Sequence, residues 1–172
     1  MKRIALAVAV VLGMSLAGKA QAQSCTTTPS CSVNASVSVT VPQILRLTLS
    51  TTSATLTAPT ETDFDAGHLQ EAGASLTATV KSNKPWNVSV QSQNATWNTV
   101  PSGSKPASDL QWSKTSGSGY VGLSNSAANV YGANQGATGN GATSFFFNTL
   151  YSYANDVPGA YSITVIFTVT AP

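Results

Sequence analysis

The chain has 172 residues, and only 8% of them are charged, against about 25% in ordinary domains. Three of the eight basic residues (Lys2, Arg3 and Lys19) lie in an N-terminal segment that we expect to be removed, which leaves five against six acidic residues and a net charge near −1. So few Lys and Arg residues cannot form a phosphate-binding stripe, which excludes a nucleic-acid partner. A surface with little charge repulsion suits a protein that packs against copies of itself or lies in a matrix.

Residues 1–22 have the pattern of a cleaved export signal. Lys2 and Arg3 precede an apolar stretch over residues 4–16, and Ala20-Gln21-Ala22 is a small-x-small cleavage site. The stretch is too short for a membrane span, and no second run long enough to span a bilayer follows. We therefore predict a signal peptide over 1–22, a single domain over 23–172, and an exported protein in the periplasm, at the cell surface or outside the cell.

Two cysteines, Cys25 and Cys31, lie close together in CTTTPSC at the start of the mature chain. In an oxidising compartment such a pair is expected to form a disulfide. Closing so short a loop stabilises by roughly 2 kcal/mol in the chain-entropy description, so the bond would pin a turn rather than hold the fold together.

Alternating apolar and polar residues predict strands along most of the remaining chain. In Ser32–Val41 (SVNASVSVTV) one face carries Val33, Ala35, Val37, Val39 and Val41. Trp86 follows Pro85 in phase with two valines and is predicted to lie in the core. Further strands are predicted over 44–49, 54–57, 75–81, 86–91, 110–114, 120–123, 143–151 and 161–170, with 75–81 and 86–91 forming a hairpin.

The last predicted strand lies in AYSITVIFTVTAP. Its core face would consist of Tyr161, Ile163, Val165, Phe167 and Val169. Neither this strand nor Ser32–Val41 carries a charge that would protect an exposed edge from aggregation. The edge must therefore be covered, either by an earlier piece of the same chain or by another molecule.

About nine closely spaced strands, with almost no helical periodicity between them, predict an all-β fold. The arrangement expected is one immunoglobulin-like antiparallel β-sandwich.

Residues able to perform chemistry are scarce. With one histidine and no G-x-S-x-G sequence, the chain is predicted not to be an enzyme and to need no cofactor. Asp63, Asp65 and His68 in TETDFDAGH could contribute to a cation site, but without the spacing of known calcium loops a surface turn is expected. Trp97 and Trp112 are candidates for stacking on the sugar rings of a polysaccharide. Of the three tryptophans, Trp97 is the one expected to be exposed, and the position of Trp112 stays open.

The export signal, the early pair Cys25 and Cys31, the alternating segment Val33–Val41 and the ending PGAYSITVIFTVTAP together resemble the chaperone–usher pilins and their spore coat protein U-like branch. In that family an incomplete immunoglobulin-like fold is completed by the N-terminal extension of a neighbouring subunit. The resemblance implies that the five apolar residues of Val33–Val41 are donor positions. It also implies that the partners are copies of the chain or related subunits, with a periplasmic chaperone.

Two features depart from that family. The chain ends in Ala171-Pro172 rather than in an aromatic-containing terminus, and only Pro42 and Gln43 separate the donor-like segment from the next strand. The short connection favours a self-contained sandwich in which Val33–Val41 is the first strand. The functions that remain open are a surface structural or fibre-forming adhesive subunit, a carbohydrate- or matrix-binding module, and a self-contained secreted domain of unassigned role.

Overall fold

The computed structural model of the chain describes residues 24–26, 28, 30–100, 104–131 and 140–171. The predicted signal peptide lies outside them. The chain divides into two compact units, residues 1–40 and 41–172. Among the described residues of the first unit there is no helix or strand, and residues 32–40 are exposed. The strand predicted over Ser32–Val41 is therefore not formed within this chain. No helix among the described residues is long and apolar enough to cross a membrane.

The second unit is built on an antiparallel five-stranded sheet. The order in this sheet is β1-β2-β8-β5-β6, so β1 and β6 form its edges. β2 is the long central strand, and it pairs with β1 on one side and β8 on the other. The strands are β1 (Leu45–Leu49), β2 (His68–Ser82), β5 (Leu110–Ser113), β6 (Val121–Gly122) and β8 (Asn140–Leu150).

Two smaller antiparallel sheets complete the unit. The three-stranded sheet has the order β10-β3-β7, and β4 pairs with β9 in a sheet of two strands. These strands are β3 (Asn87–Ser92), β4 (Asn98–Val100), β7 (Ala128–Asn129), β9 (Ala160–Ser162) and β10 (Val165–Thr170). The described residues thus form ten strands rather than about nine, and the predicted all-β class is confirmed.

The core is one hydrophobic cluster to which both larger sheets contribute. Phe145 of β8 is 0% exposed, and its ring centroid lies 5.7 Å from that of Trp112 and 4.9 Å from that of Phe167. Burying a side chain of this size stabilises by about 1.5–3 kcal/mol. Trp86 is 4% exposed, which confirms its predicted place in the core.

The predicted hairpin is wrong, because β2 and β3 belong to different sheets. The chain turns at Ser82, whose hydroxyl donates to the carbonyl oxygen of Lys84 (2.8 Å) and accepts from its N–H (3.1 Å). No strand forms over 54–57. The last predicted strand is divided, because Ala160–Ser162 pairs with β4 whereas Val165–Thr170 pairs with β3.

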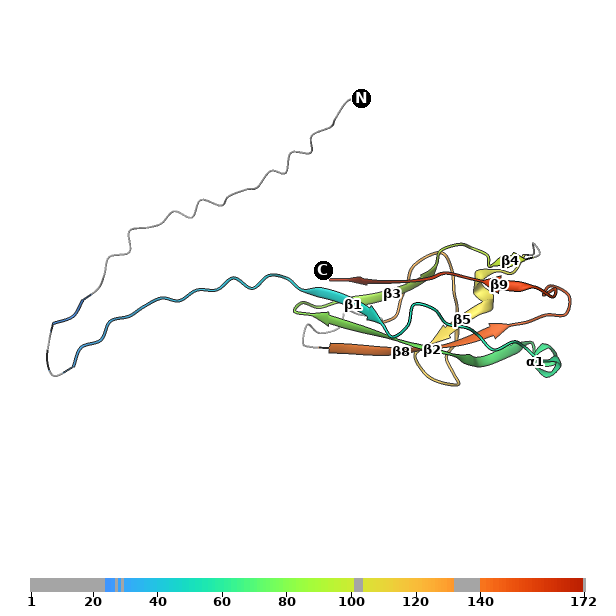
Figure 1. Cartoon of the computed structure of the whole chain (residues 1–172), viewed down its shortest axis with the longest axis horizontal. Helices are drawn as coiled ribbons and strands as arrows, with labels where there is room; N and C mark the ends of the chain where they lie inside the picture. Colours follow the sequence, from blue (N-terminus) through green and yellow to red (C-terminus); the bar gives the residue numbers. More distant parts are fainter. Residues whose placement is uncertain (1–23, 27, 29, 101–103, 132–139, 172) are drawn as a thin grey trace, which may run out of the picture. The chain divides into compact units, whose positions relative to one another are not determined.

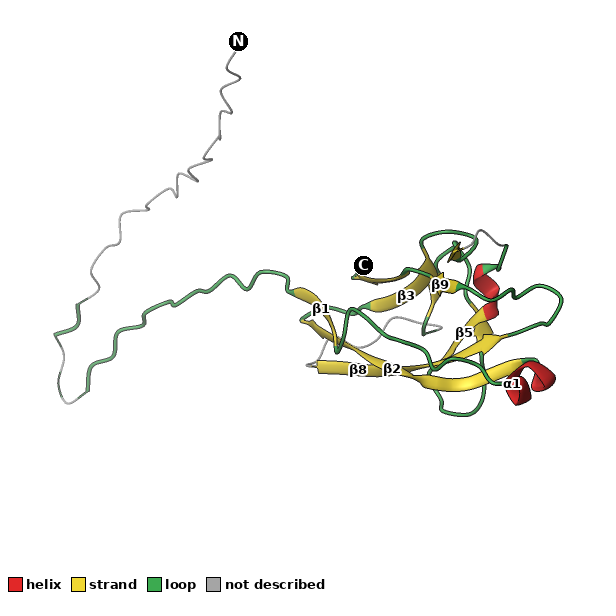
Figure 2. Cartoon of the chain, turned by 45° about the vertical axis from the view of Figure 1, so that its right-hand side comes forward, coloured by secondary structure: helices red, strands yellow, loops and turns green. Residues whose placement is uncertain are grey.

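Two short helices interrupt the strands, α1 (Glu61–Ala66) and the 3-10 helix η1 (Ala107–Asp109) (Figure 2). The sequence predicts a turn where α1 forms. At its start the Thr60 hydroxyl and main-chain N–H both donate to a carboxylate oxygen of Asp63 at 2.7 Å. Gly67 ends it in the left-handed conformation at φ 73°, which glycine adopts without strain. Six residues are too few for helical periodicity to be recognised.

Candidate functional site: an apolar groove between two sheet edges

The two edge strands β1 and β10 border the site. β10 pairs with β3 from Val165 opposite Ser92 to Thr170 opposite Asn87. Along its other edge β10 has no ladder partner among the described residues. β1 and β10 are neighbours along one side of the unit and run in opposite directions (Figure 1). The sheets therefore do not close on this side, and the main-chain groups along the free edge of β10 are available to another strand.

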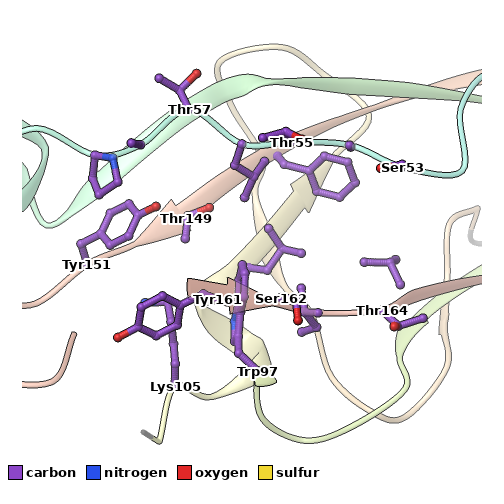
Figure 3. Close-up of a pocket in the computed structure, with 18 of the residues that line it drawn as sticks. Ser53, Thr55, Thr57, Trp97, Lys105, Thr149, Tyr151, Tyr161, Ser162 and Thr164 are labelled. Atoms are coloured by element: carbon purple, nitrogen blue, oxygen red, sulfur yellow. The ribbon is translucent and has the colours of Figure 1, made fainter. Parts of the chain in front are cut away.

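A cavity of about 780 Å³ lies along this side. One wall is the segment 51–59, which carries Ser53, Thr55 and Thr57, and the other carries Tyr161, Ser162 and Thr164 (Figure 3). Apolar side chains also line it, from both larger sheets and the segments between: Leu49, Leu56, Leu76, Leu110, Phe147, Ile163, Val165 and Phe167. We call this cavity, with the free edges of β1 and β10, the edge groove.

Four of the five residues of the predicted core face of the last strand line this cavity: Tyr161, Ile163, Val165 and Phe167. Tyr161, Ile163, Val165, Phe167 and Val169 all pack against the core but are only partly buried. Three residues of β1 also pack against the core and are only partly buried: Leu45, Leu47 and Leu49. These residues all contact the core, and their partial exposure shows that this face is incompletely covered within this chain.

A buried ion cluster lies at one end of the groove. Lys105 is 3% exposed, and its Nζ donates to Asp156 at 2.8 Å, to Asp109 at 3.1 Å and to the carbonyl oxygen of Leu150 at 2.6 Å. Its Nζ also lies 4.9 Å from the centre of the Tyr151 ring, and burial raises the pKa of that tyrosine. Three acceptors match the three donors of an ammonium group. The cluster therefore fixes the groove wall. No pattern in the sequence around Lys105 predicts a buried lysine.

The expectation that Trp97 is exposed is wrong. Trp97 and Trp112 are each 7% exposed, so neither presents a free ring face to solvent. Trp112 packs against Phe145, whereas Trp97 lines the edge groove. The main chain at Trp97 is held there because the main-chain N–H of Trp97 donates to the carbonyl oxygen of Lys105 at 2.8 Å.

The acidic residues near α1 have structural contacts. Asp63 caps the helix, and the donated hydrogen bonds, chiefly from the Thr60 hydroxyl, hold its pKa below the usual range. Asp65 accepts from the Tyr153 hydroxyl at 3.1 Å, and Nδ1 of His68 lies 3.0 Å from the carbonyl oxygen of Ala66. Nowhere in the described part of the chain do three or more His, Cys, Asp or Glu residues gather closely enough to hold a metal ion.

The candidate donor residues lie in an exposed, uncharged segment. Val33, Val37, Val39 and Val41 are 51%, 95%, 85% and 71% exposed. Cys25 and Cys31 form a disulfide with a Cα–Cα distance of 5.9 Å, inside the range for such bonds. The disulfide closes a ring that ends immediately before Ser32.

No protein-family model matches the chain, and no curated protein matches it.

Proposed function

We propose that the protein is an exported structural subunit of a surface fibre. In this proposal it is an immunoglobulin-like sandwich with one edge left open, and copies join when a strand from one chain is added to the next. The observation that carries the proposal is the edge groove: a cavity between the segment 51–59 and residues 161–167, beside the unpaired edge of β10, in a chain whose segment Ser32–Val41 is exposed and unpaired.

The chemistry of segment and groove is complementary. Ser32–Val41 alternates five apolar with five polar residues. Tyr161–Thr170 alternates in the same way except at Ile166, and neither segment carries a charge. An added strand gains main-chain hydrogen bonds from the free edge of β10 and places alternate side chains in the groove. Burying each exposed valine contributes up to about 1.5–3 kcal/mol. Because donor and groove are different surfaces, the contact repeats head to tail and generates a fibre.

Chain geometry supports insertion into a second copy. Leu45 pairs with Ser82 and Thr170 pairs with Asn87, so β1 begins near the end of the groove where β10 ends. All the ladders in the described structure are antiparallel. A donor antiparallel to β10 would place Val41 about 30 Å away, beside Tyr161. The connection from Val41 to Leu45 spans at most about 14 Å. The short connection therefore opposes self-insertion without hindering insertion into a neighbour.

The test compares two pairs of substitutions in the mature chain, residues 23–172. Val37→Asp with Val39→Asp places carboxylates on the donor face, whereas Ser36→Asp with Ser38→Asp adds the same charge to the opposite face. All four positions are exposed, so the fold should be unaffected. Light scattering should detect large multimers for the unsubstituted protein and the serine variants. The valine variant should be monomeric, because burying unpaired carboxylates costs several kcal/mol.

A monomeric unsubstituted chain, under conditions where circular dichroism shows it folded, would contradict the proposal. Equal multimerisation of both variants would also contradict it. The periplasmic chaperone implied by the resemblance would be a second occupant of the same groove before assembly, and would have to leave before a subunit could bind.

A further inference from the structure

The donor segment is bounded on both sides by features that cannot enter a strand ladder. On its N-terminal side, the Cys25–Cys31 disulfide closes a seven-residue ring, which is wider than a single extended chain. On its C-terminal side, Pro42 has no N–H to donate and is confined to strand edges and ends. Ten residues lie between them, Ser32–Val41, and the acceptor run Tyr161–Thr170, which covers the last two residues of β9, residues 163–164 and β10, also has ten.

Matching these lengths in antiparallel orientation gives one register. Ser32 faces Thr170 at one end, and Val41 faces Tyr161 at the other. The five apolar donor residues then face the five inward apolar residues of Tyr161–Thr170, and Ser36 faces Ile166 on the other side of the strand. A shift by one residue would turn every donor valine to solvent, so only shifts by two compete with this register.

Side-chain size favours the same register. It places Ala35, the one small residue of the donor face, opposite Phe167. The Phe167 ring already contacts that of Phe145, which is 0% exposed, so this level of the groove is filled by two aromatic rings. Large and small residues at facing positions fill an interface without strain. A shift by two would replace Ala35 at this position with a valine.

We propose that Ser32–Val41 occupies the edge groove of a second copy antiparallel to β10, in one register in which Ala35 faces Phe167. The Cys25–Cys31 ring and Pro42 act as the two stops that fix it. This inference rests on the proposed fibre function and adds to it a defined register and a role for the disulfide. If the strand slid by two in one direction, Cys31 would have to enter the ladder. If it slid by two in the other, Pro42 would have to do so.

Cysteine pairs in the full mature chain test the register. Asn34→Cys with Thr168→Cys joins residues that face each other, with Cβ atoms about 4.5–5.5 Å apart. Ser36→Cys with Thr164→Cys joins residues that face each other only if the donor is shifted by two residues, in the direction that the Cys25–Cys31 ring blocks. Thr40→Cys with Thr168→Cys joins residues that face each other only if the donor lies parallel to β10. All five positions are exposed and polar, so the pairs are matched controls. On mild oxidation, non-reducing electrophoresis should show a covalent ladder for the first pair, at least about tenfold stronger than for the others.

The disulfide is tested by adding Cys25→Ser and Cys31→Ser to the first two pairs. Opening the ring should weaken the cross-linked bands formed by Asn34→Cys with Thr168→Cys. It should strengthen the cross-linked bands formed by Ser36→Cys with Thr164→Cys several-fold. An unchanged ratio would overturn the role of the ring. Multimers without a ladder from the first pair would overturn the register while leaving strand addition intact. If light scattering detects no multimers of the unsubstituted chain, the proposed function itself fails.

Discussion

The buried ion cluster at the end of the edge groove allows a quantitative prediction. The side chains of Lys105 and Asp156 are 3% and 6% exposed, whereas that of Asp109 is 23% exposed and can be rehydrated. Lys105→Met removes the cation and leaves the Asp156 carboxylate buried with only the N–H of Ser152, which donates at 2.8 Å. Breaking a buried pair in this way costs about 3–5 kcal/mol.

Removing the acidic partner instead of the lysine should lower the free energy of unfolding by a smaller amount. Asp156→Asn leaves Lys105 with Asp109 and the carbonyl oxygen of Leu150, so the ammonium keeps two of its acceptors. The expected loss is about 1–3 kcal/mol. The double variant leaves no uncompensated charge at position 156, so its loss should be smaller than the sum of the two single losses by about 1–3 kcal/mol.

Urea unfolding followed by tryptophan fluorescence measures these losses. The measurement is made in the Val37→Asp, Val39→Asp background, so that unfolding is not coupled to assembly. With a slope of about 2 kcal/mol per M for a domain of this size, Lys105→Met should lower the midpoint by roughly 2 M. Additivity of the two substitutions within about 0.5 kcal/mol would refute the reasoning, because it would mean that Lys105 and Asp156 do not interact in the folded protein.

Further experiments test the core, the α1 cap and the proposed fibre contact. A Cβ added at Gly141 would collide with the Trp86 indole, so Gly141→Ala should destabilise by about 1–3 kcal/mol in the same assay, whereas Ala142→Ser at the exposed neighbouring position should not. The lowered pKa of Asp63 means that its carboxylate stabilises the fold above the unfolded pKa of about 3.9, and that this contribution is lost as the pH falls through the folded value. Thr60→Val should therefore raise the pKa of Asp63 in an NMR titration, and an unchanged pKa would show that the cap does not form. Preformed multimers should resist dissociation by 1 M salt, since neither contact strand is charged, and dissociation by salt would contradict an apolar groove.

Short-range patterns predicted the strands well where one face is buried. Alternation located β1, β3, β5 and much of β2, β8 and β10, because side chains at every second position determine which face of a strand meets the core. It did not predict β4 and β7, which have three and two residues. Such strands form because the surrounding chain brings them to a partner, and so few residues carry no periodic signal.

The site was harder to predict than the fold. The five inward residues of Tyr161–Val169 follow directly from alternation, but the groove they line depends on which sheet each strand joins. β2 and β3 are close in sequence and lie in different sheets, a choice that local turn residues do not determine. The buried Lys105 depends on acceptors from positions 109, 150 and 156, which only the tertiary fold brings together.

The first segment shows why a strand pattern alone cannot identify its partner. Ser32–Val41 and Tyr161–Thr170 have the same length, carry no charge and alternate alike except at Ile166, and these properties describe a strand within the domain as well as one donated to a neighbour. The distinguishing quantity is the reach of the connection to β1. A connection of four Cα–Cα steps cannot carry an antiparallel strand back along the whole length of β10. The shortness that favoured a self-contained sandwich on the sequence alone therefore favours donation once β1 and β10 are placed. A Gly/Ser linker of about twelve residues inserted after Pro42 should let the segment reach its own groove, converting multimers into monomers, and multimers of undiminished size would refute this argument.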